Sequence, residues 1–256
     1  MLRPNTMKAK LQQGLPAVGI SLTFPSPHLV EVAAYCGFDW VLLDCEHGSM
    51  TPESVEVMAM AAELAGIVPI VRPPTNAPHE LLRYLDRGCM GVQVPHVSTA
   101  QQARAAAEAV RYFPQGHRGL AAGALRAATF GMRATQAEWV EWVNRESLVC
   151  VQIEDPEGVR NLDAILEVAG VDVFFLGAND LSAAMGYATQ AGHPEVKKVV
   201  DAALARIHAA GKTSGGSGSP AALAAYRRQG VRYLYTHVPT VMRLGAAQAL
   251  AQALEG

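Results

Sequence analysis

Acidic side chains follow two short apolar runs in the C-terminal half of the chain. Glu154 ends the run 149–154, and Asp180 comes shortly after the run 173–177. If these runs are neighbouring parallel strands, the two carboxylates meet at one end of the sheet and repel unless a proton or a cation lies between them. Mg²⁺ and Mn²⁺ accept oxygen ligands and keep positions open for substrate. The sequence therefore predicts a divalent-metal site; the alternative is that each carboxylate caps a helix or pairs with an arginine.

A histidine and an arginine follow two earlier apolar runs. Asp44 and His47 lie three residues apart after the run 40–44, close enough for the carboxylate to orient the imidazole directly or through water. Imidazole exchanges protons near neutral pH, so His47 is a candidate general base; the alternative is a hydrogen bond within its loop. Arg72 ends the run 68–72. Its guanidinium is suited to an oxyanion or a substrate carboxylate, or to a salt bridge with a neighbouring glutamate.

Other polar features carry weaker predictions. Glu46 is expected to point away from this group if the strand alternation continues past Asp44. His96 and His237 are interpreted as satisfied loop histidines, and segment 211–220, whose order differs from a phosphate-binding loop, as a flexible barrel loop. The four cysteines lack a C-x-x-C spacing, which predicts reduced thiols, mostly in the core.

The residues that could do chemistry must be positioned by eight β-branched runs, most of which are followed by a helix-forming stretch. This alternation of strand and helix is typical of a parallel sheet. The expected strands are 17–23, 40–44, 68–72, 91–95, 149–154, 173–177, 212–216 and 232–236. Expected helices cover 52–65 after a Thr51 cap, 100–110, 135–144, 194–210 and 241–254; the last closes the barrel or packs on a neighbouring subunit. We therefore predict a single (β/α)8 TIM barrel over residues 1–256, with its active site at the C-terminal strand ends.

The composition fits this fold and argues against other classes. Half of the residues are hydrophobic and 17% are charged, as suits strands buried on both faces. A formal net charge of −2 offers no basic surface for nucleic acid. The longest apolar runs are too short to span a membrane, and the N-terminus lacks an apolar signal core. We therefore expect a cytoplasmic protein without nucleic-acid or membrane partners.

Taken in order, the motifs resemble those of the HpcH/HpaI family of metal-dependent 4-hydroxy-2-oxo-acid aldolases along nearly the whole chain. The resemblance is carried by Phe38-Asp-Trp-Val-Leu-Leu-Asp-Cys-Glu-His47, Val68-Pro-Ile-Val-Arg72-Pro, Val94-Pro-His-Val97, Gln152-Ile-Glu154, Leu176-Gly-Ala-Asn-Asp-Leu-Ser182 and Gly192-His-Pro-Glu-Val196. It implies a TIM barrel of the phosphoenolpyruvate/pyruvate-binding type. It also implies reversible cleavage of a 4-hydroxy-2-oxo acid to pyruvate and an aldehyde through a metal-bound pyruvate enolate.

The resemblance assigns roles to the residues that could do chemistry. Glu154 and Asp180 match the family's ligands for Mg²⁺, Mn²⁺ or Co²⁺, with no organic cofactor. Arg72 matches its catalytic arginine, and His47 with Asp44 its histidine–carboxylate pair. The enzyme implied is a class II pyruvate aldolase, of the kind used in aromatic compound catabolism.

Further positions match substrate and subunit contacts of the family. Gln152 matches a substrate-side position, and the backbone that receives the pyruvate carboxylate corresponds to Gly177, Ala178 and Asn179. Asp86 matches an acidic residue presented to the histidine of an adjacent subunit. The resemblance therefore implies a homo-oligomer, a trimer or a hexamer, with sites near subunit interfaces.

The sequence leaves the aldehyde and some alternatives open. Cys45 stands where many family members have glycine, Ala178-Asn179 replaces a commoner Pro-Ala pair, and segment 214–219 is unusually rich in glycine and serine. The same chemistry would serve an oxaloacetate-type decarboxylase or a citramalyl or citryl-type lyase. A non-catalytic carboxylate-binding barrel is a further alternative, although it needs no general base.

Overall fold

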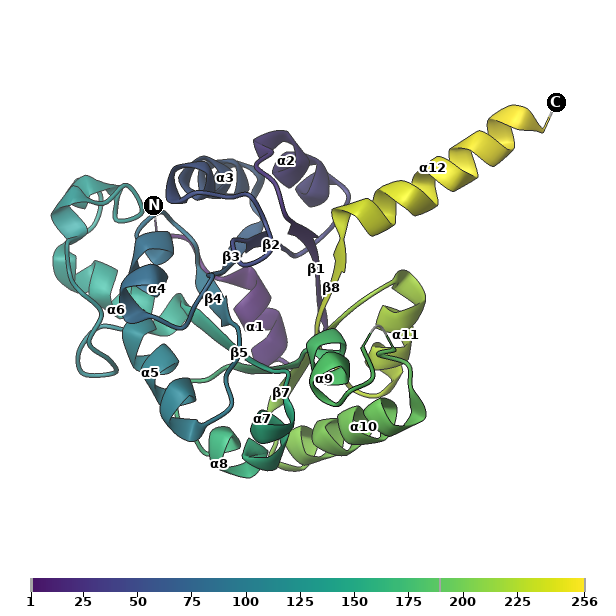
Figure 1. Ribbon diagram of the computed structural model, residues 1–256. Helices are drawn as coiled ribbons and strands as arrows, with labels where there is room; N and C mark the ends of the chain where they lie inside the picture. Colours follow the sequence, from purple (N-terminus) through teal and green to yellow (C-terminus); the bar gives the residue numbers. More distant parts are fainter. Residues whose placement is uncertain (1, 189, 256) are drawn as a thin grey trace.

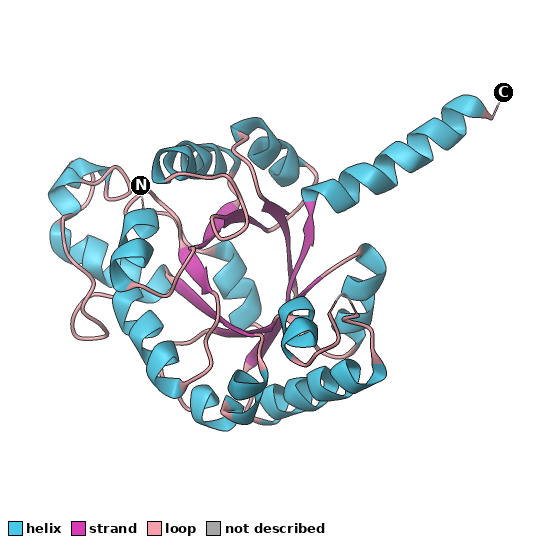
Figure 2. Ribbon diagram, viewed as in Figure 1, coloured by secondary structure: helices cyan, strands magenta, loops and turns pink. Residues whose placement is uncertain are grey.

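Eight parallel strands close into a barrel surrounded by helices in the computed structural model (Figures 1 and 2). The structure describes residues 2–188 and 190–255. The strands pair in chain order, and the first closes against the last. They are β1 Ala17–Leu22, β2 Trp40–Asp44, β3 Val68–Arg72, β4 Gly91–Val94, β5 Leu148–Ile153, β6 Val173–Leu176, β7 Thr213–Ser217 and β8 Tyr233–His237. The predicted TIM barrel is confirmed, and each predicted strand end lies within one residue of the observed end.

Helices form the outer ring, and many begin at a capping side chain. Thr51, Thr99 and Thr135 each form a capping box at the start of a helix, which satisfies backbone N–H groups that have no partner within the helix. The helices are α1 Thr6–Gln12, α2 Pro27–Tyr35, α3 Pro52–Ala65, α4 Pro78–Leu85, α5 Ala100–Val110, α6 Gln136–Glu146, α7 Pro156–Arg160, α8 Leu162–Leu166, α9 Ala178–Ala184, α10 Pro194–Ala209, α11 Pro220–Arg228 and α12 Val238–Leu254.

Alternate residues of each strand face the inside of the barrel. On β2, Trp40 and Leu42 belong to the interior cluster, whereas Val41 and Leu43 pack beneath the helices. Asp44 occupies the next inward position. The same spacing of two leads from interior apolar residues to polar ends on β3 and at the end of β5, at Arg72, Gln152 and Glu154. Strand geometry therefore delivers these polar groups to the C-terminal mouth.

Aromatic rings fill the barrel, and a glycine on β7 makes room for them. The ring centroids of Trp40 and Tyr233 are 4.3 Å apart. A Cβ on Gly215 would lie 2.8 Å from a ring atom of Phe175 and 3.0 Å from one of Tyr233. The interpretation of segment 211–220 as a flexible loop is wrong for residues 213–217, because its glycines and serines form a strand packed against bulky interior side chains.

The last helix leaves the barrel. Figure 1 shows α12, in yellow, projecting away from the ring of helices. Val238 is its only buried residue, and Met242 and Leu250 are 62% and 61% exposed. Of the two predicted roles, closing its own barrel is therefore wrong, and packing on a neighbouring subunit stays a prediction. Within the described residues, no helix is both long and apolar enough to cross a membrane.

Gly19 on β1 offers a test of the interior packing. A Cβ at this position would lie 2.3 Å from Cε2 of the fully buried Trp40. We expect Gly19→Ala to lower the free energy of unfolding by about 1–3 kcal/mol, because the indole or the strand must move. Urea denaturation measures the change. The control is Gly192→Ala, where a Cβ meets nothing within 4 Å; equal stability of the two variants would contradict this packing.

Candidate active site

A cavity of about 200 Å³ opens at the C-terminal end of the barrel. Eight of the ten predicted site residues line it, and the other two, Asp44 and Asp86, do not. The cavity is lined by His47, Arg72, Gln152, Glu154, Phe175, Gly177, Ala178, Asn179, Asp180, Ser217, Tyr235 and His237. Residues from strands far apart in the sequence therefore share one small space.

Asp44 and Arg72 form a buried ion pair on adjacent strands. They are register partners of β2 and β3, and the guanidinium donates from Nε to Oδ1 at 3.0 Å and from Nη2 to Oδ2 at 2.6 Å. The side chains are only 2% and 10% exposed. Burial opposes the charge on Arg72, but the hydrogen bonds and charge of Asp44 raise its pKa overall. The bidentate contact keeps Arg72 charged and fixes its orientation.

Asp44 contacts the backbone of His47 and not its ring. Asp44 Oδ1 accepts hydrogen bonds from the backbone N–H groups of Glu46 at 3.1 Å and His47 at 3.2 Å. The imidazole of His47 is 62% exposed, and its Nε2 lies 3.9 Å from Glu46 Oε2. In the described structure, Asp44 therefore does not orient the imidazole of His47 directly, which was one of the two predicted arrangements. Asp44 instead shapes the turn that carries His47 into the cavity.

Glu154 is a buried carboxylate with N–H groups on both oxygens. Its Oε1 accepts from the backbone N–H of His96 at 2.7 Å, and its Oε2 accepts from Gln152 Nε2 at 2.5 Å. Burial raises the pKa of Glu154, and the nearby charge of Asp180 raises it further. These hydrogen bonds oppose the rise. The carboxylate is therefore held in position but still favours a neighbouring positive charge.

The donor set at this mouth fits a divalent cation. Asp44 and Glu46 contact the guanidinium of Arg72, and Glu154 and Asp180 line the cavity beside it. Four carboxylates and one guanidinium leave an excess of three negative charges. Asp180 is exposed, but Asp44, Glu46 and Glu154 are largely buried, and burying their charge in excess of one guanidinium is costly unless a cation compensates it. Oxygen donors are the ligands that Mg²⁺ and Mn²⁺ prefer.

Gly177 keeps the space beside Glu154 open. The backbone N–H of Gly177 bonds to the carbonyl of Ile153, which brings the two strand ends together. A Cβ on Gly177 would lie 2.6 Å from Glu154 Oε2. Any larger residue would displace the carboxylate, so the close approach of this backbone helps to set its position.

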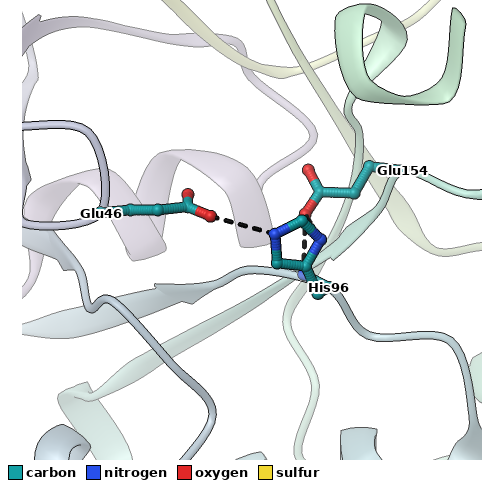
Figure 3. Close-up of side chains that lie close together, drawn as sticks. All are labelled: Glu46, His96 and Glu154. Atoms are coloured by element: carbon teal, nitrogen blue, oxygen red, sulfur yellow. Dashed lines mark hydrogen bonds and ion pairs between the residues drawn. The ribbon is translucent and has the colours of Figure 1, made fainter. Parts of the chain in front are cut away.

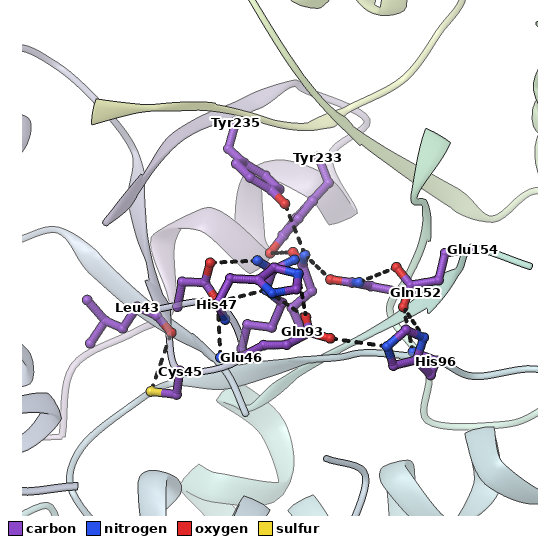
Figure 4. A network of polar contacts seen from close by, with 12 residues as sticks. Leu43, Cys45, Glu46, His47, Gln93, His96, Gln152, Glu154, Tyr233 and Tyr235 are labelled. Carbon is purple, nitrogen blue, oxygen red and sulfur yellow. Dashed lines mark hydrogen bonds and ion pairs between the residues drawn. The ribbon is translucent and has the colours of Figure 1, made fainter. Parts of the chain in front are cut away.

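A chain of hydrogen bonds connects Glu154 to the barrel interior (Figure 4). Gln93 Nε2 donates to Gln152 Oε1 at 2.5 Å, and the Tyr233 hydroxyl donates to Gln93 Oε1 at 3.0 Å. The amide of Gln152 is thereby engaged at both its oxygen and its nitrogen. Gln152 orients Glu154 from below, while its predicted contact with substrate stays a prediction. Gln93 was not among the predicted residues.

Glu46 and His96 also belong to the mouth. The expectation that Glu46 points away is wrong, because the strand ends at Asp44 and the chain turns. Glu46 Oε2 lies 3.1 Å from Arg72 Nε, and Glu46 Oε1 lies 3.3 Å from His96 Nε2. Figure 3 shows His96 between Glu46 and Glu154. Glu46 and His96 both closely follow a strand end. The criterion that selected His47, a polar residue just after an apolar run, therefore applied to them as well.

Asp86 lies outside the cavity. It follows the last residue of α4, and its Oδ1 accepts a hydrogen bond from Arg118 Nη2 at 2.7 Å. The Arg118 side chain is 2% exposed, so this ion pair is largely shielded from solvent. The predicted contact of Asp86 with a catalytic histidine therefore depends on a second copy of the chain.

Comparisons with known proteins point to one family. Residues 19–233 match the family described as HpcH/HpaI aldolase/citrate lyase. A 2-keto-3-deoxy-L-rhamnonate aldolase from Shigella sonnei is 37% identical over 214 residues, which cover 84% of this chain and 79% of that protein. The structure of an HpcH/HpaI aldolase/citrate lyase family protein from Burkholderia cenocepacia has a TM-score of 0.90 at 30% identity, covering 98% of this chain and 100% of that one. The structure of the citrate synthase SbnG has a TM-score of 0.84 at 29% identity, covering 96% of each chain.

Metal removal tests the paired carboxylates. At a hundred times its dissociation constant, Mn²⁺ should stabilise the folded protein by about 2.7 kcal/mol. Glu154→Gln and Asp180→Asn should each remove most of this gain, because each replaces a charged oxygen ligand. Calorimetric unfolding with Mn²⁺ and with a chelator measures it, and the exposed Glu157→Gln on α7 is the control. Full Mn²⁺ stabilisation of both carboxylate variants would exclude this metal site.

Proposed function

From the premise that the chain belongs to the HpcH/HpaI aldolase/citrate lyase family, we propose that it is a divalent-metal-dependent aldolase that reversibly cleaves a 4-hydroxy-2-oxo acid to pyruvate and an aldehyde. The predicted assignment to a family of carbon–carbon lyases is confirmed by that match and by the aldolase relatives. The observation that carries the proposal is the single cavity shared by His47, Arg72, Glu154 and Asp180.

Glu154 and Asp180 are the residues proposed to hold the ion, which is Mg²⁺, Mn²⁺ or Co²⁺. The excess negative charge of the mouth and the raised pKa of Glu154 support this assignment. When bound, a divalent cation supplies a Lewis acid for the keto group of the substrate.

Arg72 and the start of α9 are proposed to bind the oxo acid. The first N–H groups of a helix have no partner within it, so the backbone of Ala178 and Asn179 suits a carboxylate. The N–H of Gly177, the third predicted group, already bonds to the Ile153 carbonyl, so Gly177 contributes the space beside them. Arg72, fixed by Asp44, faces the same cavity and suits the oxygen on which negative charge develops. Asp44 therefore acts as a positioning residue for Arg72.

His47 is proposed to take the proton of the 4-hydroxyl group. As that proton leaves, the C3–C4 bond breaks, C4 becomes the aldehyde carbon, and the electron pair of the bond forms the double bond of the pyruvate enolate. Protonation at C3 then gives pyruvate. The 62% exposure of the imidazole allows His47 to return its proton to solvent.

A second cavity is proposed to receive the aldehyde part of the substrate. It measures about 310 Å³ and shares Ala178, Asn179 and Ser217 with the first cavity. Lys197 and Asp201 give it a polar wall, which suits a hydroxylated chain. The relatives are named for a 2-keto-3-deoxy sugar acid, which is itself a 4-hydroxy-2-oxo acid. A place in aromatic compound catabolism stays a prediction.

A second candidate function is supported by the similarity to a citrate synthase, SbnG. The same residues would support citrate-type carbon–carbon chemistry or decarboxylation of oxaloacetate. Decarboxylation yields no aldehyde, so the products separate these activities from the proposed aldolase reaction.

Pyruvate release from 4-hydroxy-2-oxo acids tests the proposed aldolase. We expect a chelator to abolish activity and Mg²⁺, Mn²⁺ or Co²⁺ to restore it. Arg72→Lys should lower kcat about 10²–10³-fold, because an ammonium lacks the fixed pair of donors. The exposed Arg83→Lys on α4 is the control. Undiminished turnover in chelator, or oxaloacetate decarboxylation without any aldol cleavage, would reject the proposal.

The helix α12 is proposed to pack on a second copy of the chain, as the predicted trimer or hexamer requires. It exposes Met242, Leu244, Leu250 and Leu254, and a row of exposed apolar side chains marks an association surface. The flanking helix α11 buries no residue completely, unlike α3, α5 and α10. A neighbouring subunit would also supply the histidine that Asp86 is predicted to meet.

Light scattering after size-exclusion chromatography tests this association. The double change Leu250→Asp and Leu254→Asp should lower the particle mass, because it places charges in an apolar contact. Leu250→Met with Leu254→Met keeps the apolar surface and is the control. A monomeric wild type, or an unchanged mass of the aspartate variant, would contradict the proposed packing.

A further inference from the structure

The ring of His96 presents both of its nitrogens to carboxylates. Nδ1 lies 3.0 Å from Glu154 Oε1, and Nε2 lies 3.3 Å from Glu46 Oε1 (Figure 3). A neutral imidazole has one N–H, and its other nitrogen carries a lone pair. A lone pair that faces a carboxylate is repelled. The arrangement therefore calls for a proton or a metal cation beside the second nitrogen.

The backbone of His96 favours this placement. Its φ is 53°, in the left-handed region that few residues other than glycine adopt. This conformation brings both the backbone N–H and the ring of His96 onto the same oxygen, Glu154 Oε1. The ring is 65% exposed, so burial in the core does not account for its position. The polar contacts at the mouth are what hold it.

Glu46 supplies an independent observation. Its side chain is only 10% exposed, and its Oε2 is buried without a hydrogen bond from the described residues. Arg72 Nε lies 3.1 Å from that oxygen but donates its hydrogen bond to Asp44. The charge of Arg72 stabilises this oxygen in part, but a buried carboxylate oxygen without a donor stays costly. A cation bound to the other oxygen, Oε1, would reduce the cost of the buried charge.

The spacing of the donor atoms suits one ion. One ligand atom each from Glu46, His96 and Glu154 lies within 4.8 Å of the others. In an octahedral site with ligands about 2.1 Å from the ion, adjacent ligands are about 3.0 Å apart. An ion takes only one nitrogen of an imidazole, and the 3.3 Å between His96 Nε2 and Glu46 Oε1 is of this size. Opposite ligands of such a site are about 4.2 Å apart, within the 4.8 Å that limits the three atoms. With Nε2 on the ion, Nδ1 would donate its hydrogen to Glu154 Oε1 at 3.0 Å.

We propose that Glu46 and His96 join Glu154 in binding the divalent ion, so that the site has both nitrogen and oxygen ligands. Imidazole nitrogen binds Co²⁺ and Mn²⁺ better than it binds Mg²⁺, which prefers oxygen and retains its water. The chain therefore selects a transition metal over Mg²⁺. This inference deepens the proposed function by naming further ligands and a metal class, and it depends on that proposal only through the shared Glu154.

Metal titration of the full-length protein tests the selectivity. After removal of metal by a chelator, calorimetric titrations with CoCl₂ and MgCl₂ should give tighter binding of Co²⁺. His96→Gln should weaken Co²⁺ binding about tenfold or more, the scale seen when a supporting group is removed from a metal site, and should change Mg²⁺ binding far less. Glu46→Gln should weaken both. His237→Gln, which removes another imidazole of the cavity, is the matched control.

Pulsed electron paramagnetic resonance of bound Mn²⁺ reads the ligand directly. The wild type should show coupling to an imidazole nitrogen, and its ¹⁵N-histidine-labelled form should show the isotope change, so this readout requires no variant. His96→Gln should lose the signal and His237→Gln should keep it. Absence of nitrogen coupling in the wild type, or its persistence in His96→Gln, would overturn the inference and leave a protonated imidazole between the two carboxylates.

The outcomes for the ligand set and for the reaction are separable. A wild type with nitrogen coupling that releases no pyruvate from any 4-hydroxy-2-oxo acid would support the ligand set and reject the proposed function. A metal-dependent aldolase whose bound Mn²⁺ shows no nitrogen coupling would support the proposed function and reject the ligand set.

Discussion

A concentration of negative charge at the barrel mouth is the constraint on which the rest of the site depends. The carboxylates of Asp44 and Glu46 contact one guanidinium, and those of Glu154 and Asp180 line the same mouth. Glu154 is almost fully buried, and its pKa is raised by that burial and by Asp180. Hydrogen bonds hold the carboxylate in place without neutralising it. The protein has thus fixed in place a carboxylate whose negative charge its surroundings disfavour, and a divalent cation would stabilise that charge.

Asp44 and Arg72 show the opposite arrangement, in which a buried charge already has its partner. Asp44 gives both of its oxygens to Arg72, so this pair is electrically balanced within the barrel wall. The bidentate contact fixes the geometry of the pair, so the guanidinium faces the cavity in one conformation. One part of the mouth therefore has its charge satisfied by the fold, while the part around Glu154 is left to interact with ligands.

The scaffold beneath the mouth is rigid for reasons of packing. Trp40, Phe175, Tyr233 and Tyr235 fill the barrel, and Gln93 links the aromatic hydroxyls to Gln152 and so to Glu154. A shift of Tyr233 or Tyr235 would be transmitted through Gln93 and Gln152 to the carboxylate. The outer helices contribute differently, because α12 leaves its own barrel and presents an apolar surface to its surroundings.

The sequence by itself determined the strands, and with them the residues that arrive at the mouth. Period-two alternation and the order of strand and helix depend on local chemistry, which is why Asp44, Arg72 and Glu154 were predictable as inward-facing strand ends. Only the tertiary structure decided which groups touch. The turn after β2 brings Glu46 back towards His96, and Asp44 bonds to the backbone of His47 instead of its ring. These contacts depend on turns and on the register between strands, which no single segment encodes.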